Sequence, residues 1–261
     1  MVEGVDYFLP KIDLSTWKVT IPTPRADGNA TEVHPPDISG YATNDLLTEF
    51  MYNDSTDGSL VFYTYPNATT ANSSYSRTEL RELIDGESAK INWTFAEGGR
   101  MKGTLSVPEI STNAGGNPHR TIIMQIHGRL TDAQKNLIGA NDNNAPPVLK
   151  LQWYRGQIRV HTKVLKDLNA SSTEILETDA WGNEAFNFSE YVGHDKFTLE
   201  IIASEGRMEV ILNGNESKVY EGIHMEKWGD FENYFKAGNY LGTTEAGAFA
   251  KVKYYDLEVM H

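Results

Sequence analysis

Tyrosine, lysine and glycine alternate in one short segment whose side chains could bind a charged ligand. If this segment is a β-strand, its two-residue side-chain period places on one face Tyr234, Lys236, Gly238 and Tyr240. Two phenols and an ammonium group around a glycine are a poor filling for a core. The face suits a polar, anionic ligand. The alternative is a solvated sheet face in which Tyr and Lys serve β-propensity and solubility.

Two further segments carry polar side chains with the same alternating spacing. Arg77, Glu79 and Arg81 share one face of the first segment, and Gln125 and His127 share one face of the second. The opposite face of the second segment carries apolar side chains that we expect in the core, namely Ile122, Met124 and Ile126. If all three polar faces line one sheet, the resulting groove suits a carboxylated polymer, because arginine binds carboxylates in bidentate geometry. Glu79, between two arginines, is then their orienting partner rather than a catalytic acid.

Each group also has a purely structural interpretation. A lone histidine is more often a structural residue than a base, but the place of His127 opposite an apolar face and two residues from Gln125 favours a functional role. Arg77 and Arg81 alone would indicate a solvated ion-pair stripe. We expect core packing rather than sugar stacking for the tryptophans, which are Trp17, Trp93, Trp153, Trp181 and Trp228.

The elements that must position these groups are short strands. The segment that begins at Ile12 is predicted to become a strand that ends at Pro22. Alternating patterns and turn signals predict ten further strands, which are Leu60–Tyr65, Ser76–Ile84, Met101–Val107, Arg120–His127, Val148–Tyr154, Gln157–Val164, Lys196–Ala203, Arg207–Leu212, Tyr234–Tyr240 and Ala250–Val259. We expect loops at residues 23–45 and 131–146, and we expect the second loop to form one wall of a cleft. Helical potential is confined to residues 131–138 and 221–233. This pattern predicts an all-β antiparallel sandwich or jelly roll, with residues 1–261 as a single domain.

Composition excludes several classes of protein. The formal net charge of -13 argues against a nucleic-acid partner, and no apolar run is long enough to cross a membrane. Because this net negative charge repels anions, an anionic ligand must be held by a local patch of basic side chains. Cysteine is absent, which removes disulfides and thiolate chemistry. Residues 1–6 lack the basic and apolar regions of a signal peptide, so we expect none in this sequence.

Acceptor patterns for N-glycosylation occur more often than chance predicts. They begin at Asn29, Asn53, Asn67, Asn72, Asn92, Asn169, Asn187 and Asn215. The alternative is a loop composition that happens to be rich in Asn and Thr. We expect a secreted, extracellular glycoprotein from a eukaryotic host.

The polar segments together resemble a known family. Arg77–Glu82, Gln125–His127 and Tyr234–Tyr240, in this order, are similar to the three signature segments of the polysaccharide lyase family 7 alginate lyases. Asp13–Pro22 is similar to the first strand of that family and Tyr254–Val259 to its last, so the resemblance covers nearly the whole chain. It implies a β-jelly roll whose concave sheet binds alginate, an anionic polymer of mannuronate and guluronate.

The resemblance also implies a reaction and roles for individual residues. The reaction is a β-elimination that cuts the 1,4 link and leaves a C4=C5 double bond, and it requires no metal or other cofactor. Arg77, Gln125 and in part His127 would neutralise the carboxylate beside the C5 proton, and Tyr240 would protonate the leaving oxygen. Tyr240 would also be the base for mannuronate, whereas guluronate would need His127. The substrate chain would be held by Glu79, Arg81, Tyr234 and Lys236.

Two details and several alternatives qualify this interpretation. Ile126 stands where isoleucine, rather than valine, accompanies acceptance of guluronate in the family. The family commonly continues the Tyr240 segment with Asn-Gln, whereas this chain has Leu241 and Gly242, which puts one subsite contact in question. The alternatives are a lyase on a related uronan such as glucuronan and a non-catalytic, lectin-like module. A glycoside hydrolase would need two opposed carboxylates, and the polar faces supply only Glu79. We expect a monomer.

Overall fold

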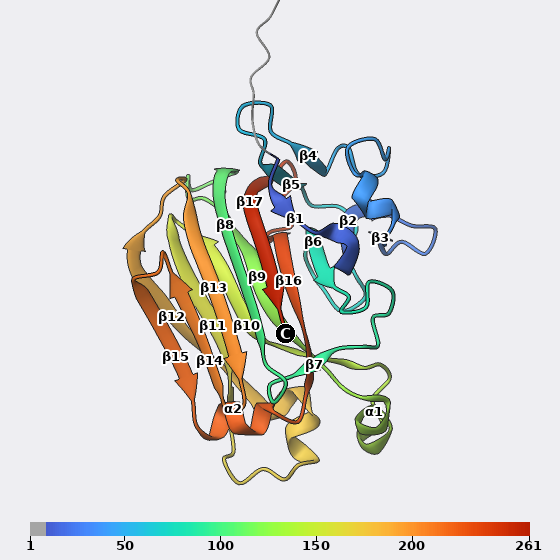
Figure 1. Cartoon of the computed structure of the whole chain (residues 1–261), viewed down its shortest axis with the longest axis vertical. Helices are drawn as coiled ribbons and strands as arrows, with labels where there is room; N and C mark the ends of the chain where they lie inside the picture. Colours follow the sequence, from blue (N-terminus) through green and yellow to red (C-terminus); the bar gives the residue numbers. More distant parts are fainter. Residues whose placement is uncertain (1–8) are drawn as a thin grey trace, which may run out of the picture.

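Two antiparallel β-sheets pack face to face in the computed structural model, which describes residues 9–261 (Figure 1). The back sheet runs in the order β15 (Glu216–Glu221), β14 (Arg207–Leu212), β13 (Phe197–Ser204), β8 (Gly99–Ile110), β17 (Ala250–Met260), β5 (Leu60–Thr64) and β4 (Met51–Asn53), with β1 (Lys11–Ile12) parallel to β17. The predicted sandwich, with its jelly-roll fold, is confirmed. Residues 1–6, where we expected no signal peptide, lie outside the described range.

The front sheet carries the polar segments. Its order is β12 (Trp181–Tyr191), β11 (Gln157–Leu165), β10 (Asn144–Tyr154), β9 (Arg120–Arg129), β16 (Glu232–Leu241), β6 (Arg77–Glu82), β2 (Trp17–Pro24) and β3 (Ala30–Val33), and β7 (Trp93–Thr94) pairs with β16. The three segments that suggested a function are thus the adjacent strands β9, β16 and β6. Their hydrogen-bonded pairing brings together side chains that are far apart in the sequence.

Helices are few and short, as expected from the sequence. They are α1 (Asp132–Ile138), α2 (Ile223–Trp228) and the 3-10 turns η1 (Leu14–Thr16), η2 (Asp37–Gly40), η3 (Glu174–Leu176) and η4 (Thr178–Ala180). Thr131 and Gln134 form a capping box at the start of α1, and Gly139 ends it in the left-handed conformation. Within residues 9–261, no helix is long and apolar enough to cross a membrane.

The core lies between the inner faces of the two sheets. Buried side chains from both sheets form one continuous apolar cluster, from Trp17 and Val19 on β2 to Tyr254 and Leu257 on β17. All five tryptophans are buried, which confirms that they pack in the core. With the inner faces filled in this way, the outer face of the front sheet is free for polar side chains.

The predicted strands form, but six strands were missed or placed in loops, among them β1 and β7, which have two residues each. β12 and β3 are edges of the front sheet, and β15 and β4 are edges of the back sheet. Because edge strands bury less side-chain surface, the alternation of apolar and polar residues in their sequences is weaker. The predicted loop 23–45 is wrong in part, because β2 continues to Pro24 and β3 follows it. Pro22 is tolerated inside β2 because the pairing with β6 ends at Thr20, and beyond it the strand pairs with β3 alone.

A β-bulge in β9 changes one predicted side-chain direction. Ile123 is an extra residue in the register of β9 with β10, because Met124 pairs with Leu151 and Ile122 with Gln152. The expectation that Ile122 shares the core face is therefore wrong. Ile123 is in the core instead, and Ile122 faces the groove beside Tyr240.

Candidate active site

A buried carboxylate organises the centre of the front sheet. Glu79 on β6 is 1% exposed, and its oxygens accept hydrogen bonds from Arg77 Nη1 at 2.9 Å and Gln125 Nε2 at 2.5 Å, besides an ion pair with Lys236. Burial would raise the pKa of Glu79, but the positive charges of Lys236 and Arg77 outweigh it and lower this pKa. The carboxylate thus fixes the direction of three donors from three strands.

The prediction that Glu79 orients both arginines holds for Arg77 and is wrong for Arg81. The Arg81 guanidinium donates instead to the Ala89 carbonyl at 2.8 Å and to Asn92 Oδ1 at 2.7 Å. It also lies over the ring of Tyr234, 4.1 Å from the ring centroid. Arg81 and Tyr234 therefore form a second unit beside the Glu79 cluster.

Lys236 is almost completely buried next to another cation. Burial and the nearby Arg77 lower the pKa of Lys236 to about 8, while Glu79 acts in the opposite direction. Two cations thus share one carboxylate, so the cluster keeps an excess of positive charge at neutral pH. An anionic ligand would be attracted to it.

His127 on β9 is held as a neutral imidazole. Its Nδ1 lies 2.9 Å from the carbonyl oxygen of Gly128, which can only accept, so Nδ1 carries the hydrogen and Nε2 keeps a free lone pair. Burial and the positive charge of Lys236 lower the pKa of His127 to about 3. The ring stacks on Tyr234, with 5.2 Å between centroids. His127 is therefore uncharged at neutral pH, with Nε2 unprotonated.

Tyr240 stands on the other side of the Glu79 cluster. The guanidinium of Arg77 lies 3.8 Å from the centroid of its ring, and the ring of Tyr75 is 6.2 Å away. The close approach of β16 to β6 at this point depends on Gly238, whose φ is +134° and where a Cβ would lie 2.6 Å from the Thr78 carbonyl. Gly238 therefore brings the phenol and the guanidinium into contact.

Two cavities lie side by side over these residues. The first cavity, of about 280 Å³, is lined by Arg77, Arg81, His127, Tyr234 and Lys236. The second cavity, of about 220 Å³, is lined by Tyr240, Arg120, Lys150, Gln152, Arg159 and His161. We call the two cavities together the groove; Arg77 of the first contacts the ring of Tyr240 in the second, and the lining residues extend over the front sheet from β3 to β11.

The groove therefore contains the predicted site residues and several that sequence reasoning missed. Gln125 and Glu79 lie beneath the others, hydrogen-bonded to each other, and the rest of the predicted set line the cavities. The missed residues are Lys18, Glu32, Arg120, Lys150, Arg159 and His161. A signal for two of them existed, because Arg159 and His161 alternate with the buried Ile158 and Val160 along β11.

Two loops meet over the first cavity. Thr70–Ser73 line it from one side and Asn144 from the other. Asn72 Nδ2 donates to Asp142 Oδ2 at 2.9 Å, which joins the two loops. The predicted loop 131–146 is wrong in part, because it contains α1 and the start of β10, but it contributes to the cleft wall, as expected, at Asn144.

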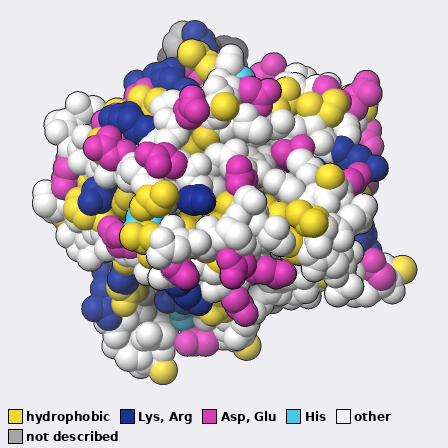
Figure 2. All heavy atoms as spheres, turned by 90° about the horizontal axis from the view of Figure 1, so that it is seen from below, with side chains coloured by type: hydrophobic (Ala, Val, Ile, Leu, Met, Phe, Trp, Pro, Cys, Tyr) yellow, Lys and Arg dark blue, Asp and Glu magenta, His cyan; other side chains and the backbone are white. Residues whose placement is uncertain are grey.

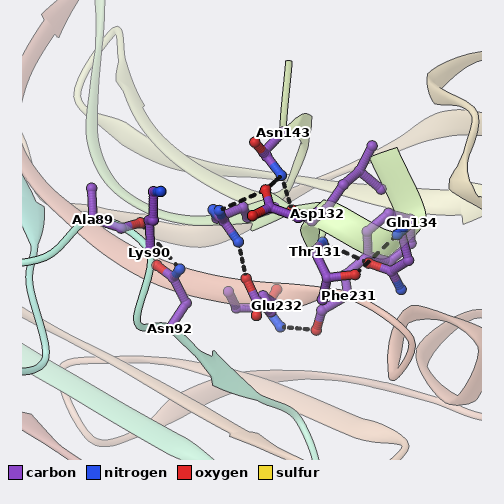
Figure 3. Close-up of polar contacts among 12 residues, drawn as sticks. Ala89, Lys90, Asn92, Thr131, Asp132, Gln134, Asn143, Phe231 and Glu232 are labelled. Carbon is purple, nitrogen blue, oxygen red and sulfur yellow. Dashed lines mark hydrogen bonds and ion pairs between the residues drawn. The ribbon is translucent and has the colours of Figure 1, made fainter. Parts of the chain in front are cut away.

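Helix α1, which precedes this wall, is tied to the end of the sheet. Arg129 forms ion pairs with Glu232 and, at 4.0 Å, with Asp132, and Asn143 donates to Asp132 at 2.9 Å (Figure 3). Gln134 also donates to the Asp230 carbonyl at 2.6 Å. These contacts connect α1 and the start of β10 to β16, so we expect the wall to keep its position over the groove.

The positive groove contrasts with the rest of the protein. The formal net charge is -13, and Figure 2 shows acidic side chains spread over the end of the sandwich near α1 and α2, with basic ones between them. Within the described part of the chain, no group of three or more His, Cys, Asp or Glu side chains is placed to hold a metal ion. The chemical groups of the groove are cations, amides, imidazoles and phenols, together with the carboxylates of Glu79 and Glu32, which pair with Lys236 and Lys18.

Comparisons with known proteins give the same family along almost the whole chain. The family model described as "Alginate lyase" matches residues 12–261. A solved structure of alginate lyase A1-II′, a member of polysaccharide lyase family 7, is similar at 29% identity and a TM-score of 0.74, over 95% of this chain and 96% of that one. A comparison with curated protein sequences gives no match.

Further solved structures extend this similarity. A double variant of A1-II′ in complex with the substrate GGMG is 28% identical, with a TM-score of 0.74 over 96% of this chain and 94% of that chain. An alginate lyase from Pseudomonas aeruginosa is 25% identical, with a TM-score of 0.69 over 96% of this chain and 100% of that chain. Each match thus extends over nearly the full length of both chains.

Proposed function

Because the chain belongs to the polysaccharide lyase family 7 of alginate lyases, we propose that it cleaves the 1,4-glycosidic bonds of alginate by β-elimination. The product would carry a C4=C5 unsaturated uronate at the new non-reducing end. The observation that carries this proposal is the Glu79 cluster, which holds Arg77, Gln125 and Lys236 beside a neutral His127 and the phenol of Tyr240.

The first requirement of the reaction is to neutralise the substrate carboxylate. The C5 proton is hardly acidic beside a charged carboxylate, because its removal adds further negative charge. Arg77 is well placed to neutralise that carboxylate, because it lines the first cavity and, within residues 9–261, its guanidinium donates only from Nη1, to Glu79. Donors preorganised in this way each stabilise the transition state by about 3 kcal/mol.

Proton transfer then breaks the glycosidic bond. The base takes the C5 proton, the electron pair of the C–H bond becomes the C4=C5 double bond, and the C4–O4 bond breaks as O4 receives the phenolic proton of Tyr240. For mannuronate, Tyr240 serves as both base and acid: its phenolate takes the C5 proton and passes the same proton to O4, because the proton and the leaving group are on the same side. For guluronate, the proton is on the opposite side and Nε2 of His127 is the base.

We also propose that guluronate-containing blocks are accepted. The neutral His127 supports this, since its unprotonated Nε2 is available as the second base that guluronate needs. Variants of one relative, alginate lyase A1-II′, were solved with the product GGG and with the substrate GGMG. Ile126 is completely buried, so any effect of this side chain on sugar preference must be indirect.

Replacing His127 by asparagine should separate the two sugars. We expect the initial rate on polyguluronate to fall by about 100-fold or more, because a general base is lost, and the rate on polymannuronate to fall by about tenfold or less. With the pKa of His127 near 3, the wild-type rate on polyguluronate should also show no inflection between about pH 6 and 7 that depends on this residue. Absorbance of the C4=C5 bond measures both rates. An equal loss on the two polymers would contradict the assignment.

The reaction itself is tested by the same absorbance on polymannuronate, polyguluronate and glucuronan. A signal on either alginate block supports the proposed reaction. A signal on glucuronan alone would instead assign the enzyme to a related uronan. No signal on any polymer, with alginate binding intact, would leave a binding module.

We further propose that the protein is a secreted glycoprotein, on the basis of its acceptor patterns. Five of the acceptor asparagines are exposed, namely Asn67, Asn72, Asn169, Asn187 and Asn215. Asn92 differs, because its carboxamide accepts from Arg81 at 2.7 Å and donates to Ala89 at 3.2 Å. After expression in a glycosylating eukaryotic host, mass spectrometry of the peptides should find glycans at exposed sites and none at Asn92. Full occupancy at Asn92, or none anywhere, would contradict this.

A monomer is the proposed functional form. The front sheet of a single chain already brings together Arg77, Gln125, His127 and Tyr240, which the proposed reaction uses. Light scattering of the purified protein should give the mass of a single chain, and a stable dimer would contradict this proposal.

A further inference from the structure

Strand β16 changes its pairing partner beside the first cavity, which leaves a gap in the sheet. On the side away from β9, it pairs with β7 as far as Asn233 and with β6 only from Lys236 onward. Among the described strands, the two residues between them, Tyr234 and Phe235, pair with β9 alone. Phe235 is completely buried, and its backbone N–H points into this gap, toward β6. Left unpaired, such an N–H would be costly.

The side chain of Glu82 fills the gap from the core side of the front sheet. Glu82, the last residue of β6, is 3% exposed. Its Oε2 accepts from the Phe235 N–H at 2.9 Å and from Trp93 Nε1 at 3.2 Å. Because Trp93 belongs to β7, one carboxylate joins β6, β7 and β16 where their backbones do not pair. It thus replaces the missing hydrogen bond between strands.

His261, which follows β17, holds the other oxygen of this carboxylate. Its Nε2 lies 2.7 Å from Glu82 Oε1, and its Nδ1 lies 3.2 Å from the carbonyl oxygen of Gly98. Both of these oxygens accept, so both ring nitrogens donate and the ring is an imidazolium. The ring also packs against Trp93 and Phe235, with 5.4 and 5.9 Å between centroids. His261 therefore fixes the direction of the carboxylate that holds Phe235.

The surroundings of His261 favour its charged form. Burial would lower the pKa of His261, but the hydrogen bond and charge of Glu82 outweigh it and raise this pKa above its ordinary value of 6.5. The carbonyl of Gly98 and the charge of Glu97, both in the turn after β7, act in the same direction. The other groups around the ring carry no charge; they are Trp93 on β7, Gly99 on β8 and Phe235 on β16.

The gap lies directly behind side chains that line the first cavity. Tyr234, the neighbour of Phe235 in the chain, stacks on His127 with 5.2 Å between centroids. A shift of the backbone at Phe235 would therefore move the Tyr234 ring and the imidazole that stacks on it. Tyr240 lies farther along β16, where the strand is paired with β6 at Arg77. The phenol is thus held independently of the gap.

We propose that Glu82 and His261 are positioning residues for the cleavage of guluronate. They hold Tyr234 in place and, through its ring, the imidazole of His127 that removes the C5 proton. Neither residue lines the groove, so neither contacts the substrate. This role rests on the proposed β-elimination, which makes His127 the base for guluronate. Cleavage of mannuronate uses Tyr240 for both proton transfers and should depend on the pair much less.

The test uses two replacements of His261 that keep different hydrogen bonds. The amide of His261→Gln reaches the place of Nε2 and keeps a donor for Glu82, whereas the shorter amide of His261→Asn reaches that of Nδ1 and keeps only the contact with Gly98. For the Asn variant we expect kcat to fall by about tenfold or more on polyguluronate, because the base is misplaced, and by less than about threefold on polymannuronate. The Gln variant should stay within about threefold of the wild type on both polymers.

Rates are measured from the C4=C5 absorbance at about pH 6, where His261 is charged, and at a temperature where every variant is folded. His194→Asn is the matched control, because His194 also packs on a tryptophan, Trp153 at 5.3 Å, and contacts a backbone carbonyl, that of Val107 at 2.7 Å. It lies in the turn between β12 and β13, away from the gap, so the ratio of the two rates should not change.

The melting temperature gives a readout that does not depend on the reaction. Because folding raises the pKa of His261, its ion pair stabilises the protein fully below about pH 6.5, and this stabilisation is lost as the pH rises through the higher pKa of the folded state. The difference in Tm between the wild type and His261→Gln should therefore shrink over this range. A difference that is constant with pH would contradict the ion pair.

Two results would overturn the positioning role while the proposed function stands. One is an Asn variant that loses nothing, or loses equally on the two polymers, as a purely structural contact would. The other is a Gln variant that loses as much on polyguluronate as the Asn variant does. Absence of any double-bond signal in the wild type would instead overturn the proposed function, and this role with it.

Discussion

Replacing Tyr240 by phenylalanine should abolish cleavage of both alginate blocks and leave alginate binding almost unchanged. The phenolic oxygen is assigned as acid for both sugars and as base for one, so we expect kcat to fall by about 1,000-fold or more. The hydroxyl forms no hydrogen bond in the described part of the chain, and the ring keeps its contact with Arg77. The variant should therefore fold with an unchanged melting temperature.

Absorbance at the C4=C5 bond measures the loss of activity, and calorimetry with an alginate oligosaccharide measures binding. Tyr75→Phe is the matched control, because Tyr75 lines the same second cavity beside Tyr240 and loses the same atom. The rate of the Tyr75→Phe variant should fall by less than about tenfold, because Tyr75 takes no part in the proton transfer. A Tyr240→Phe enzyme with a tenth or more of the wild-type kcat would exclude Tyr240 as the acid.

The second large effect is expected at Glu79, which needs no direct contact with substrate. Replacement by alanine leaves Arg77 and Lys236 close together without a counter-charge, and breaking such a buried pair costs about 3 to 5 kcal/mol in the free energy of unfolding. It also frees Arg77 and Gln125 from their fixed directions. Loss of one preorganised donor lowers kcat by about 100-fold or more.

Urea unfolding measures the stability of this variant, and activity is compared at a temperature where it remains folded. Glu209→Ala is the control, because Glu209 pairs with Arg207 at 2.7 Å in a partly exposed ion pair on the back sheet. Such a pair contributes about 1 kcal/mol or less. Because Glu79 raises the pKa of Lys236, its removal should also move this pKa below about 8. Equal effects of the two replacements would contradict the organising role of Glu79.

The strand pattern of the site was readable from local sequence. The two-residue period of a pleated strand depends only on the strand itself, so the shared face of Tyr234, Lys236 and Tyr240 follows from their spacing. The structure agrees, with Lys236 on Glu79 and Tyr240 on Arg77. The same reasoning failed at Ile122, because a bulge arises from pairing with neighbouring strands and leaves no mark in the period of one strand.

Short-range spacing and motif order were enough to predict the all-β class, the family and the side-chain face of each signature strand. The folded sheet was needed to show that Glu79 holds Arg77 but not Arg81, and that His127 is neutral with a free Nε2. It was also needed to show that Arg120 and Lys150 meet in one cavity. Register, desolvation and charge–charge interaction are set by strands that pair across long sequence separations, so no local pattern contains them.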